Sequence, residues 1–360
     1  MFLNFINRIY IKIFIIFILC IAYYSCKTVS NNSENKYIPV DVYVCDRAGY
    51  WKNGDRVEFP FDKIDLEISS FLVSGKDIYA GGSLVASHAG AGYAKACILK
   101  NGKRIPISYL CDHKDSHINS MAIYGNDIYA SGYSKTCSGL MKSGYWKNGK
   151  WIEFKKKYST ISSIIVYEGD IYTGVSRYNI DEISSADFWK SDEWTWLSYP
   201  DDSVARSGIA EIVIHNGDIY AAGSCYYGSK IRIPGYWKNG KWVKLDNHGK
   251  FVTSLFIDGE DIYISGISGD SFKQWRAGYW KNGKWIELKT TNPERDSAVS
   301  SIVVHNKNIY TAGWYENNTG YKIPCYWKNG ELVTLFYEAG GLRGRNPDVI
   351  SIIVVDKEQD

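Results

Sequence analysis

The sequence predicts an all-β protein made of tandem four-stranded units, and three observations predict this fold class. Aromatic residues make up 15% of the chain, with 29 Tyr and 13 Trp, and such side chains pack well on pleated sheets. Two short motifs, Asp-Ile-Tyr and Trp-Lys-Asn-Gly, recur along the chain, and no helical pattern lies between them. Intact or degraded copies of the second motif begin at Trp51, Leu99, Trp146, Trp189, Trp237, Trp280 and Trp327, in steps of 43 to 48 residues. A repeat of this length indicates a solenoid or a propeller.

Each unit is predicted to hold four short strands. The first is an apolar run such as residues 300–306 (SSIVVHN), which is expected to be buried on both faces. The second carries the Asp-Ile-Tyr motif. The third and fourth come from GYWKNGKW, which spans residues 144–151, 235–242 and 278–285. Asn-Gly favours a type I′ turn, so this segment is predicted to be a hairpin whose aromatic side chains pack between units and do not bind a ligand.

The two ends of the repeated region are complementary fragments. Residues 41–44 (DVYV) match the second strand of a unit, and residues 350–355 (ISIIVV) match the first strand. The last fragment can therefore complete the first unit. This predicts a closed, seven-bladed β-propeller over residues 37–360, with four antiparallel strands per blade and a closing blade completed by the C-terminal strand.

The N-terminus reads as a targeting segment. Arg8 and Lys12 precede an unbroken apolar run at residues 13–22, which is too short to span a bilayer and fits a secretory signal. A small residue before Cys26 is similar to the lipidation box of bacterial lipoproteins. We therefore expect a lipoprotein-type signal peptide at residues 1–25, lipidation at Cys26 and a polar tether at residues 26–36. A plain secretory signal with an incidental cysteine is the alternative, so the protein is expected to be exported to the cell envelope or secreted.

Charge and cysteine usage exclude some classes of function. Without residues 1–25, the 42 basic residues become 40 against 39 acidic ones, so a net charge near +1 gives no electrostatic reason to expect nucleic-acid binding. Six cysteines remain after Cys20 and Cys26, with irregular spacing and no CxxC pair. No metal site or cofactor is predicted, and the disulfide connectivity stays open.

Function is expected on one face of the ring. The connections between second and third strands are long and differ between units, at residues 83–94, 133–143, 176–186, 224–234, 267–277 and 314–324. Variable loops on a rigid scaffold commonly bind ligands. A basic residue precedes the third-strand Trp position in six blades, which predicts a broken ring of positive charge: Arg47, Lys95, Lys142, Arg232, Arg276 and Lys322. With loop aromatics predicted to be exposed, the candidate ligand-binding residues are Arg47, Arg232, Arg276, Trp275, Trp314, Tyr315, Tyr226 and Tyr227.

The opposite face carries an Asp at the start of the second strand in six of the seven units, as at Asp77 and Asp127, and the last unit has Asn308. These carboxylates are expected to bond the turn backbone rather than a metal ion. No pair of carboxylates or nucleophile motif stands out, so no catalytic residue is assigned.

The repeats resemble the kelch family of propellers. Residues 78–82 (IYAGG) carry the paired glycines of a kelch blade, and Tyr145 and Trp151 stand where its later aromatics do. The chain is also similar to uncharacterised bacterial lipoproteins with tandem YWKNG repeats, which implies a surface location and no known reaction.

The sequence thus predicts an exported, lipid-anchored monomer that acts as a non-catalytic binding module. It would bind a protein or an anionic or glycan ligand through the long-loop face, touching the membrane only through its lipid. A carbohydrate-active hydrolase or lyase using the same face is the alternative. A third reading is a structural envelope protein that only spaces other components.

Overall fold

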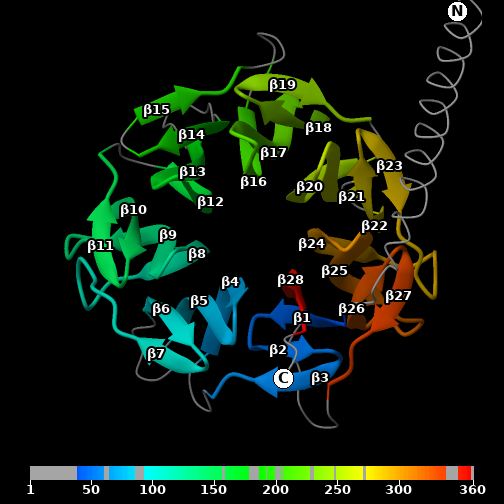
Figure 1. The fold of residues 1–360 in the computed structure, drawn as a ribbon, viewed down its shortest axis with the longest axis horizontal. Helices are drawn as coiled ribbons and strands as arrows, with labels where there is room; N and C mark the ends of the chain where they lie inside the picture. The colour runs from blue at the N-terminus through cyan, green and yellow to red at the C-terminus, as the bar shows by residue number, and fades with distance from the viewer. Residues whose placement is uncertain are drawn as a thin grey trace, which may run out of the picture. The chain divides into compact units, whose positions relative to one another are not determined.

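The chain forms a seven-bladed β-propeller, as predicted (Figure 1). The computed structural model describes residues 39–60, 65–85, 93–155, 159–177, 186–191, 193–198, 204, 206–227, 231–246, 249–270, 273–337 and 348–357. Its larger compact unit, Asp41–Val355, holds the blades, and the smaller unit combines Met1–Val40 with Asp356–Asp360. The predicted signal segment, the predicted lipidation site at Cys26 and the predicted tether lie outside the described residues. Within the described ranges, no helix is long and apolar enough to cross a membrane.

The blades are numbered along the chain, and their strands are given from the centre of the ring outward (Figure 1). Blade 1 is β28 (Val349–Asp356), β1 (Val40–Asp46), β2 (Gly49–Lys52) and β3 (Asp55–Glu58). Blade 2 is β4 (Asp65–Ser74), β5 (Asp77–Val85), β6 (Ala94–Lys100) and β7 (Lys103–Ile105). Blade 3 is β8 (Ser116–Tyr124), β9 (Asp127–Lys135), β10 (Met141–Lys147) and β11 (Lys150–Glu153). Blade 4 is β12 (Ser159–Tyr167), β13 (Asp170–Arg177), β14 (Ala186–Lys190) and β15 (Glu193–Trp196).

The remaining three blades follow the same plan. Blade 5 is β16 (Arg206–His215), β17 (Asp218–Tyr227), β18 (Ile231–Lys238) and β19 (Lys241–Lys244). Blade 6 is β20 (Gly249–Asp258), β21 (Asp261–Asp270), β22 (Lys273–Lys281) and β23 (Lys284–Glu287). Blade 7 is β24 (Ser297–His305), β25 (Asn308–Glu316), β26 (Lys322–Lys328) and β27 (Glu331–Thr334).

The ring is closed by both ends of the repeated region. The C-terminal strand β28 lies beside β1 and is the innermost strand of blade 1. Ser300 Oγ of blade 7 donates a hydrogen bond to Val349 O of β28. Ile350, Ile353 and Val355 pack against the core shared by blades 1 and 2. The predicted closure by the C-terminal strand is therefore confirmed.

The Trp-Lys-Asn-Gly segment forms the predicted hairpin. In blade 3, Asn148 and Gly149 have φ values of 50° and 82°, the left-handed conformation that a type I′ turn requires. Trp146 is fully buried and donates from Nε1 to the carbonyl of Ser108, in the segment that arrives from blade 2. The indole therefore packs between two blades and donates to the segment joining them, as the repeat pattern predicts.

The two faces of the ring differ in their connections. The turns from first to second and from third to fourth strands lie on one face, here called the tight-turn face. The other connections lie on the opposite face, the long-loop face. Three of its predicted loops are mostly strand: β17 and β18 are separated only by residues 228–230, β21 and β22 by 271–272, and β25 and β26 by 317–321. The prediction of long loops there was wrong because the antiparallel ladder continues to the ends of the aromatic-rich strands.

Candidate functional site

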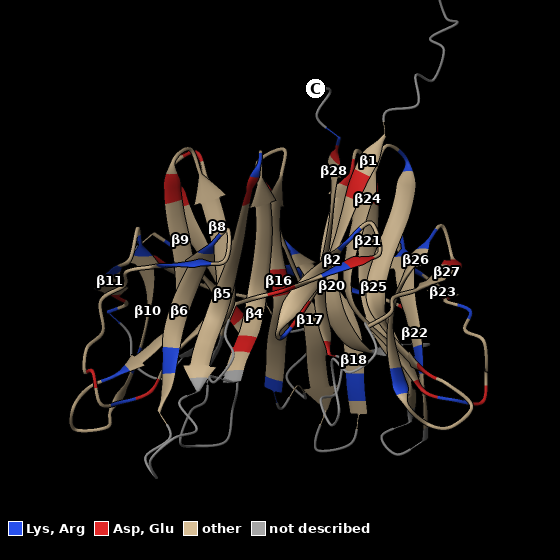
Figure 2. Cartoon of the chain, turned by 90° about the horizontal axis from the view of Figure 1, so that it is seen from below, with Lys and Arg blue, Asp and Glu red and all other residues tan. Residues whose placement is uncertain are grey.

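Seven of the eight predicted ligand-binding residues lie in strands and not in loops. Tyr226 and Tyr227 end β17, Arg232 is near the start of β18, and Trp275 and Arg276 lie in β22. Trp314 and Tyr315 lie in β25, whereas Arg47 stands between β1 and β2. All of them are close to the long-loop face, where Figure 2 shows basic residues on the lower parts of several strands. Strand placement fixes these side chains more rigidly than a loop would.

Two arginines flank one tyrosine in blade 5. Tyr226 is the register partner of Arg206 on β16 and of Arg232 on β18, so the three side chains share one face of the sheet. The guanidinium carbons of Arg206 and Arg232 lie 4.7 and 4.4 Å from the centroid of the Tyr226 ring. Both arginines are thus held by cation–π contacts.

The same surface continues into blades 6 and 7 through three aromatic rings. Arg232 also lies 4.0 Å from the ring centroid of Phe251 on β20. The Phe251 ring is 6.3 Å from that of Trp275, which is 6.4 Å from that of Trp314. Lys322 Nζ ends the series, 4.1 Å from the Trp314 ring centroid. We call the seven side chains of this series the cation–aromatic row: Arg206, Tyr226, Arg232, Phe251, Trp275, Trp314 and Lys322.

The cations of the row have no carboxylate partner among the described residues. No nitrogen of Arg206, Arg232 or Lys322 lies within 4.0 Å of a carboxylate oxygen in that part of the chain, although Glu316 is the register partner of Lys322. Burial, with a further contribution from the charge of Arg206, lowers the pKa of Arg232 to about 10. Arg232 still carries its charge at neutral pH, and that charge is incompletely solvated and repelled by its neighbour. An anion placed beside both guanidinium groups would relieve both effects.

Three of the six basic residues of the predicted broken ring lie within 4.0 Å of a carboxylate. Arg47 pairs with Glu67 and Asp348, and Lys142 pairs with Glu153. Lys95 Nζ donates to the carbonyls of Cys111 and Lys114, and Arg276 donates to the carbonyl of Arg295 and lies 3.9 Å from Glu287. Carboxylates therefore offset only part of the predicted broken ring. The position of each basic residue within the repeat could be read from the sequence. Which of them has an acidic neighbour could not.

Two of the predicted aromatic contacts belong to the core, because successive side chains of a strand point to opposite faces. Tyr315 is 7% exposed, packs among buried residues of blades 6 and 7, and makes a 3.2 Å hydrogen bond between its hydroxyl and Thr334 Oγ1. Tyr227 packs against the core shared by blades 4 and 5. Trp314 is only 6% exposed, so its ring supports Lys322 and Trp275 from below. The expected exposure of Trp314 and Tyr315 was wrong.

Exposed apolar side chains flank the row at both ends. Ile231, next to Arg232, is 60% exposed, and Tyr321, next to Lys322, is 71% exposed. The backbone of Tyr321 makes two hydrogen bonds with Asn317. Its amide donates to Asn317 Oδ1, and its carbonyl accepts from the backbone amide of Asn317. Ile231 is the register partner of Tyr227, so its side chain points to the opposite face of the sheet from Arg232.

Sequence reasoning missed Phe251 as a site residue. Phe251 precedes the bulge of β20, at a position where β4 has Glu67, β8 has His117, β16 has Gly208 and β24 has Ala298. A blade-by-blade alignment would have marked it as the one aromatic residue among these. It connects Arg232 of blade 5 with Trp275 of blade 6.

The aspartates of the tight-turn face have a structural role, but not with the partner that was predicted. Asp127 Oδ2 accepts from Lys147 Nζ at 2.8 Å, and Asp127 Oδ1 accepts from Asn148 Nδ2 at 2.6 Å. The partners are thus side chains of the Trp-Lys-Asn-Gly motif, not turn backbone. In turn, Asn148 Oδ1 accepts from the amide of Ile128. The two motifs of each repeat therefore clasp one another. Among the described residues, no group of three or more His, Cys, Asp or Glu could hold a metal ion.

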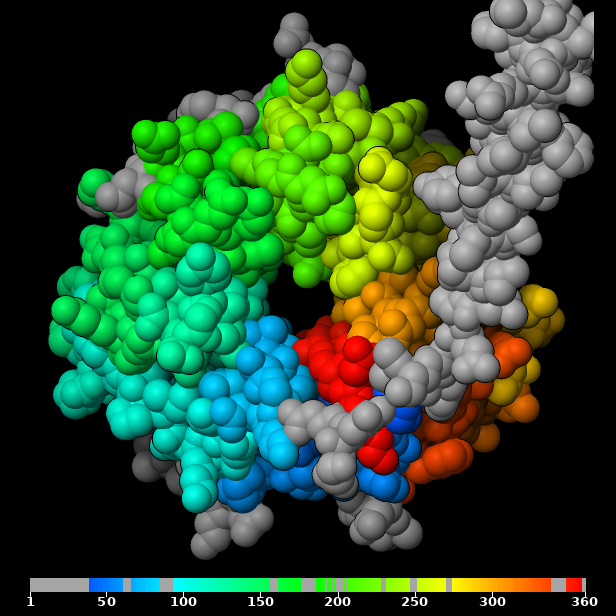
Figure 3. Space-filling model, in the orientation of Figure 1, coloured from blue at the N-terminus to red at the C-terminus, as the bar shows by residue number. Residues whose placement is uncertain are grey.

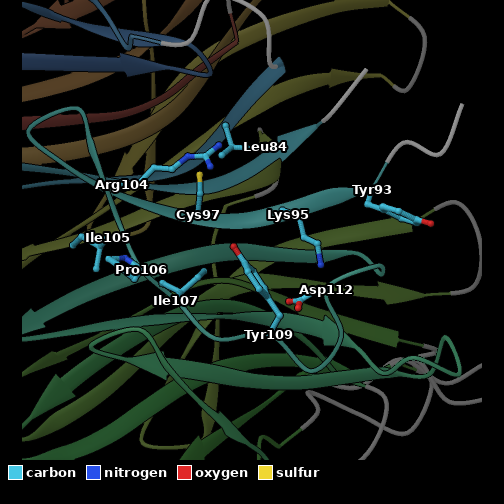
Figure 4. Close-up of a pocket in the computed structure, with 10 residues that line it drawn as sticks. All are labelled: Leu84, Tyr93, Lys95, Cys97, Arg104, Ile105, Pro106, Ile107, Tyr109 and Asp112. Atoms are coloured by element: carbon cyan, nitrogen blue, oxygen red, sulfur yellow. The ribbon is translucent and has the colours of Figure 1, made fainter. Parts of the chain in front are cut away.

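A side pocket of about 570 Å³ lies beside the third strand of blade 2 (Figure 4). In blade 3, the amide of Phe154 donates a hydrogen bond to the carbonyl of Ser143, which is the residue equivalent to Ala96 of blade 2. In blade 2, the carbonyl of Ala96 accepts instead from the hydroxyl of Tyr109, which reaches back from the connecting segment. The segment consequently stands away from β6, and the pocket is the space between them.

His117 lies in β8, near the long-loop face. Its Nδ1 is 3.0 Å from Ser83 Oγ, and its ring stacks on Tyr133 with centroids 6.2 Å apart. Burial lowers the pKa of His117. The charge of Glu67 raises this pKa and that of Arg47 lowers it, so the net shift favours the neutral imidazole. These contacts account for His117 as a packed side chain.

Comparison with known proteins identifies the architecture. No family model and no curated protein matches the chain. Among solved structures, an ulvan lyase from a family of polysaccharide lyases matches with a TM-score of 0.50 and 15% identity, over 82% of this chain and 84% of that one. A puromycin-hydrolysing peptidase of Mycobacterium tuberculosis matches with a TM-score of 0.56 and 8% identity, over 82% of this chain and 49% of that one.

A sialidase of Trypanosoma rangeli in complex with the inhibitor DANA matches with a TM-score of 0.45 and 10% identity, over 78% of this chain. The chain spans 56% of the length of that sialidase. At such identities the likeness shows the fold alone. The comparisons therefore show a β-propeller, and the kelch resemblance remains an expectation.

Proposed function

We propose that the protein is a binding module for an extended anionic glycan, which lies along the cation–aromatic row across blades 5, 6 and 7. The observation that carries this proposal is the placement of two arginines at one end of a series of aromatic rings and a lysine at the other, none of which has an ion pair with an acid of the described ranges. Guanidinium groups bind carboxylate and sulfate in a two-point manner. Aromatic rings offer flat apolar surfaces on which the faces of sugar rings can stack.

The arrangement favours a ligand with repeated charge. Arg206 and Arg232 lie on either side of Tyr226 in register, and Phe251 and Trp275 separate this pair from Lys322. An anion at each end and an uncharged sugar ring between them would match this order. Acidic polysaccharides that alternate charged and uncharged units have this pattern. A protein partner with acidic side chains is the less favoured ligand, because aromatic rings that can stack on sugars separate the cations of the row.

Lipid attachment at Cys26 and residence in the cell envelope are part of this proposal. Such a location would place the long-loop face among extracellular or envelope polysaccharides. A tether of residues 26–36 would leave the ring free to turn toward a polymer.

The test uses residues 37–360 on an array of neutral, sulfated and uronate-containing oligosaccharides, with release of product monitored in parallel. We expect binding of acidic glycans without product, and loss of about tenfold or more in affinity for Arg232→Ala, since a hydrogen bond to a charged group contributes about 1.5–3 kcal/mol. Arg47→Ala is the matched control, because Arg47 is satisfied by two carboxylates in blade 1. Release of product would establish the carbohydrate-active alternative, and equal affinity of Arg232→Ala and wild type would refute the row.

A further inference from the structure

The innermost strands carry one equivalent position that faces the centre of the ring. The position directly follows a β-bulge in blades 2 to 7, for example between Ile118 and Ser120. Its occupants around the ring are Ser70, Ser120, Ser163, Glu211, Ser254, Ser301 and Ser351. Six are serine and one is glutamate, so Glu211 breaks the repeat.

The serines at this position join neighbouring blades. Ser70 Oγ accepts from the amide of Met121 in blade 3 at 2.9 Å. Ser120 Oγ accepts in the same way from Ile164 at 3.2 Å, and Ser163 Oγ accepts from Ile212 at 3.4 Å. Ser254 Oγ accepts from the amide of Ile302 at 3.4 Å, so four of the six serine hydroxyls satisfy one backbone N–H of the following inner strand, which is a structural task.

Glu211 performs this task with one of its two carboxylate oxygens. Its Oε2 accepts from the amide of Leu255 at 2.8 Å and from Ser254 Oγ at 2.7 Å. Within the described part of the chain, Glu211 Oε1 has no hydrogen-bond donor. The joint between blades 5 and 6 is therefore complete without Oε1. A serine would have been enough for the joint, so the charge needs another explanation.

The central channel in which Glu211 lies is a cavity of about 390 Å³, open at the middle of the ring (Figure 3). Its wall is rich in hydroxyl groups, and it includes apolar side chains on the tight-turn side of the serines, such as Leu72, Ile165 and Val213. Glu211 is the one charged residue among the described residues that line it. The channel therefore has a net negative charge that no basic side chain in its wall offsets. Burial raises the pKa of Glu211, although its two donors act in the opposite sense.

We propose that the central channel binds a primary alkylammonium group, with the ammonium at Glu211 and the alkyl stem against the apolar wall. An ammonium group has three N–H donors, which Glu211 Oε1 and the neighbouring serine hydroxyls can accept. A calcium ion is a poorer fit, because it takes six to eight oxygen ligands that normally include several carboxylates. The channel offers one. The open ends of the ring allow a linear ligand, such as an amine or a lysine side chain of a partner, to enter.

The experiment measures binding of n-butylammonium chloride to residues 37–360 by calorimetry and thermal shift. Tetramethylammonium chloride, which has the charge but no N–H donor, is the ligand control. Glu211→Ser is the protein control, because it restores the residue that six blades have at this position and keeps an acceptor for the amide of Leu255. Glu211→Gln keeps the shape without the charge and serves if the serine variant does not fold.

We expect saturable binding of n-butylammonium to the wild type, at least tenfold weaker binding of tetramethylammonium, and loss of n-butylammonium binding in both variants. The affinity should fall as the pH is lowered through the raised pKa of Glu211, because protonation removes the charge. Equal binding by wild type and Glu211→Ser would overturn the proposal. So would saturable stabilisation by calcium chloride that depends on Glu211, since the site would then be a metal site.

Discussion

Asn148 Nδ2 lies 2.6 Å from Asp127 Oδ1, and this hydrogen bond joins the two sequence motifs of the repeat. The distance between the two residues along the chain is 21 positions, yet the pair sits at adjacent tight turns of one blade. The same pair occurs as Asn101 with Asp77, Asn239 with Asp218 and Asn282 with Asp261. Blade 7 has Asn308 in place of the aspartate and keeps the hydrogen bond from Asn329. The recurring motifs are therefore the two halves of one clasp.

The clasp predicts an order of stability among variants of Asp127. Asp127→Asn should be tolerated well, because blade 7 shows that asparagine accepts the same hydrogen bond. Asp127→Ala should lower the melting temperature more, because Asn148 then loses an acceptor and the lysine loses its partner. Thermal denaturation of the two variants beside the wild type measures this. Equal melting temperatures for all three would show that the clasp is unimportant.

Acid should weaken the propeller through the same aspartates. The hydrogen bond from Lys147, and then that from Asn148, lowers the pKa of Asp127, and the pKa values of the equivalent Asp77, Asp170, Asp218 and Asp261 are lowered too. A carboxyl with a lowered folded pKa gives stability that is present above its unfolded pKa and is lost as the pH falls through the folded pKa. We expect the melting temperature to fall steadily below about pH 4. High salt should reduce this loss, because the ion pairs are exposed.

Glu211 contributes to pH dependence in the opposite direction. Its pKa is raised in the folded state, so its contribution to stability is present below the unfolded pKa and is lost as the pH rises through the folded pKa. The melting temperature of Glu211→Ser minus that of the wild type should therefore increase between about pH 4 and pH 7. A difference that stays constant across this range would mean that the carboxyl titrates normally.

The architecture could be predicted from the sequence because it depends on local, repeated signals. Asn148-Gly149 predicts its turn from conformational preference alone, and the complementary fragments at residues 41–44 and 350–355 predict closure. The candidate site could be predicted only in part. Arg232 is a member of the row. Arg47 and Arg276 occupy the same position of the repeat, but each lies near a carboxylate. Whether a cation has an acidic neighbour depends on side-chain contacts across strands, as between Arg276 and Glu287 in blade 6, or between blades, as between Arg47 and Glu67.

The closing blade provides a test of the ring. Deletion of residues 349–360 removes β28, whose side chains pack against blades 1 and 2 and whose Val349 accepts from Ser300. Loss of an innermost strand exposes apolar core and leaves β1 with an unpaired edge. We expect loss of the cooperative unfolding transition, measured by circular dichroism. Deletion of residues 358–360 alone, which keeps all of β28, is the control and should melt as the wild type does.

The disulfide between Cys111 and Cys137 joins the segment that precedes β8 to the segment that follows β9. Its sequence separation is 26 residues, and a loop of this size predicts stabilisation of about 3 kcal/mol. The double variant Cys111→Ser, Cys137→Ser should lose about this amount of unfolding free energy in urea. The four other cysteines in the described residues, Cys45, Cys97, Cys225 and Cys325, are buried thiols, so Cys325→Ser tests the effect of removing a thiol that is not part of a disulfide. Equal stability of the double variant and the wild type would contradict the predicted contribution.

Two substitutions at Arg232 separate the contribution of its charge to ligand binding from the contribution of its two-point hydrogen bonding. Its guanidinium plane contacts the rings of Tyr226 and Phe251, and its fork can bind an anion in two-point fashion. Arg232→Lys keeps the charge and loses the fork, so affinity for sulfated and uronate-containing oligosaccharides should fall while its dependence on salt remains. Arg232→Ala should lose affinity and also flatten the salt dependence, because fewer charges are then screened. Calorimetric titrations at low and high salt measure both quantities. Wild-type affinity in Arg232→Lys would mean that the row provides only positive potential, and the two-point recognition would be wrong.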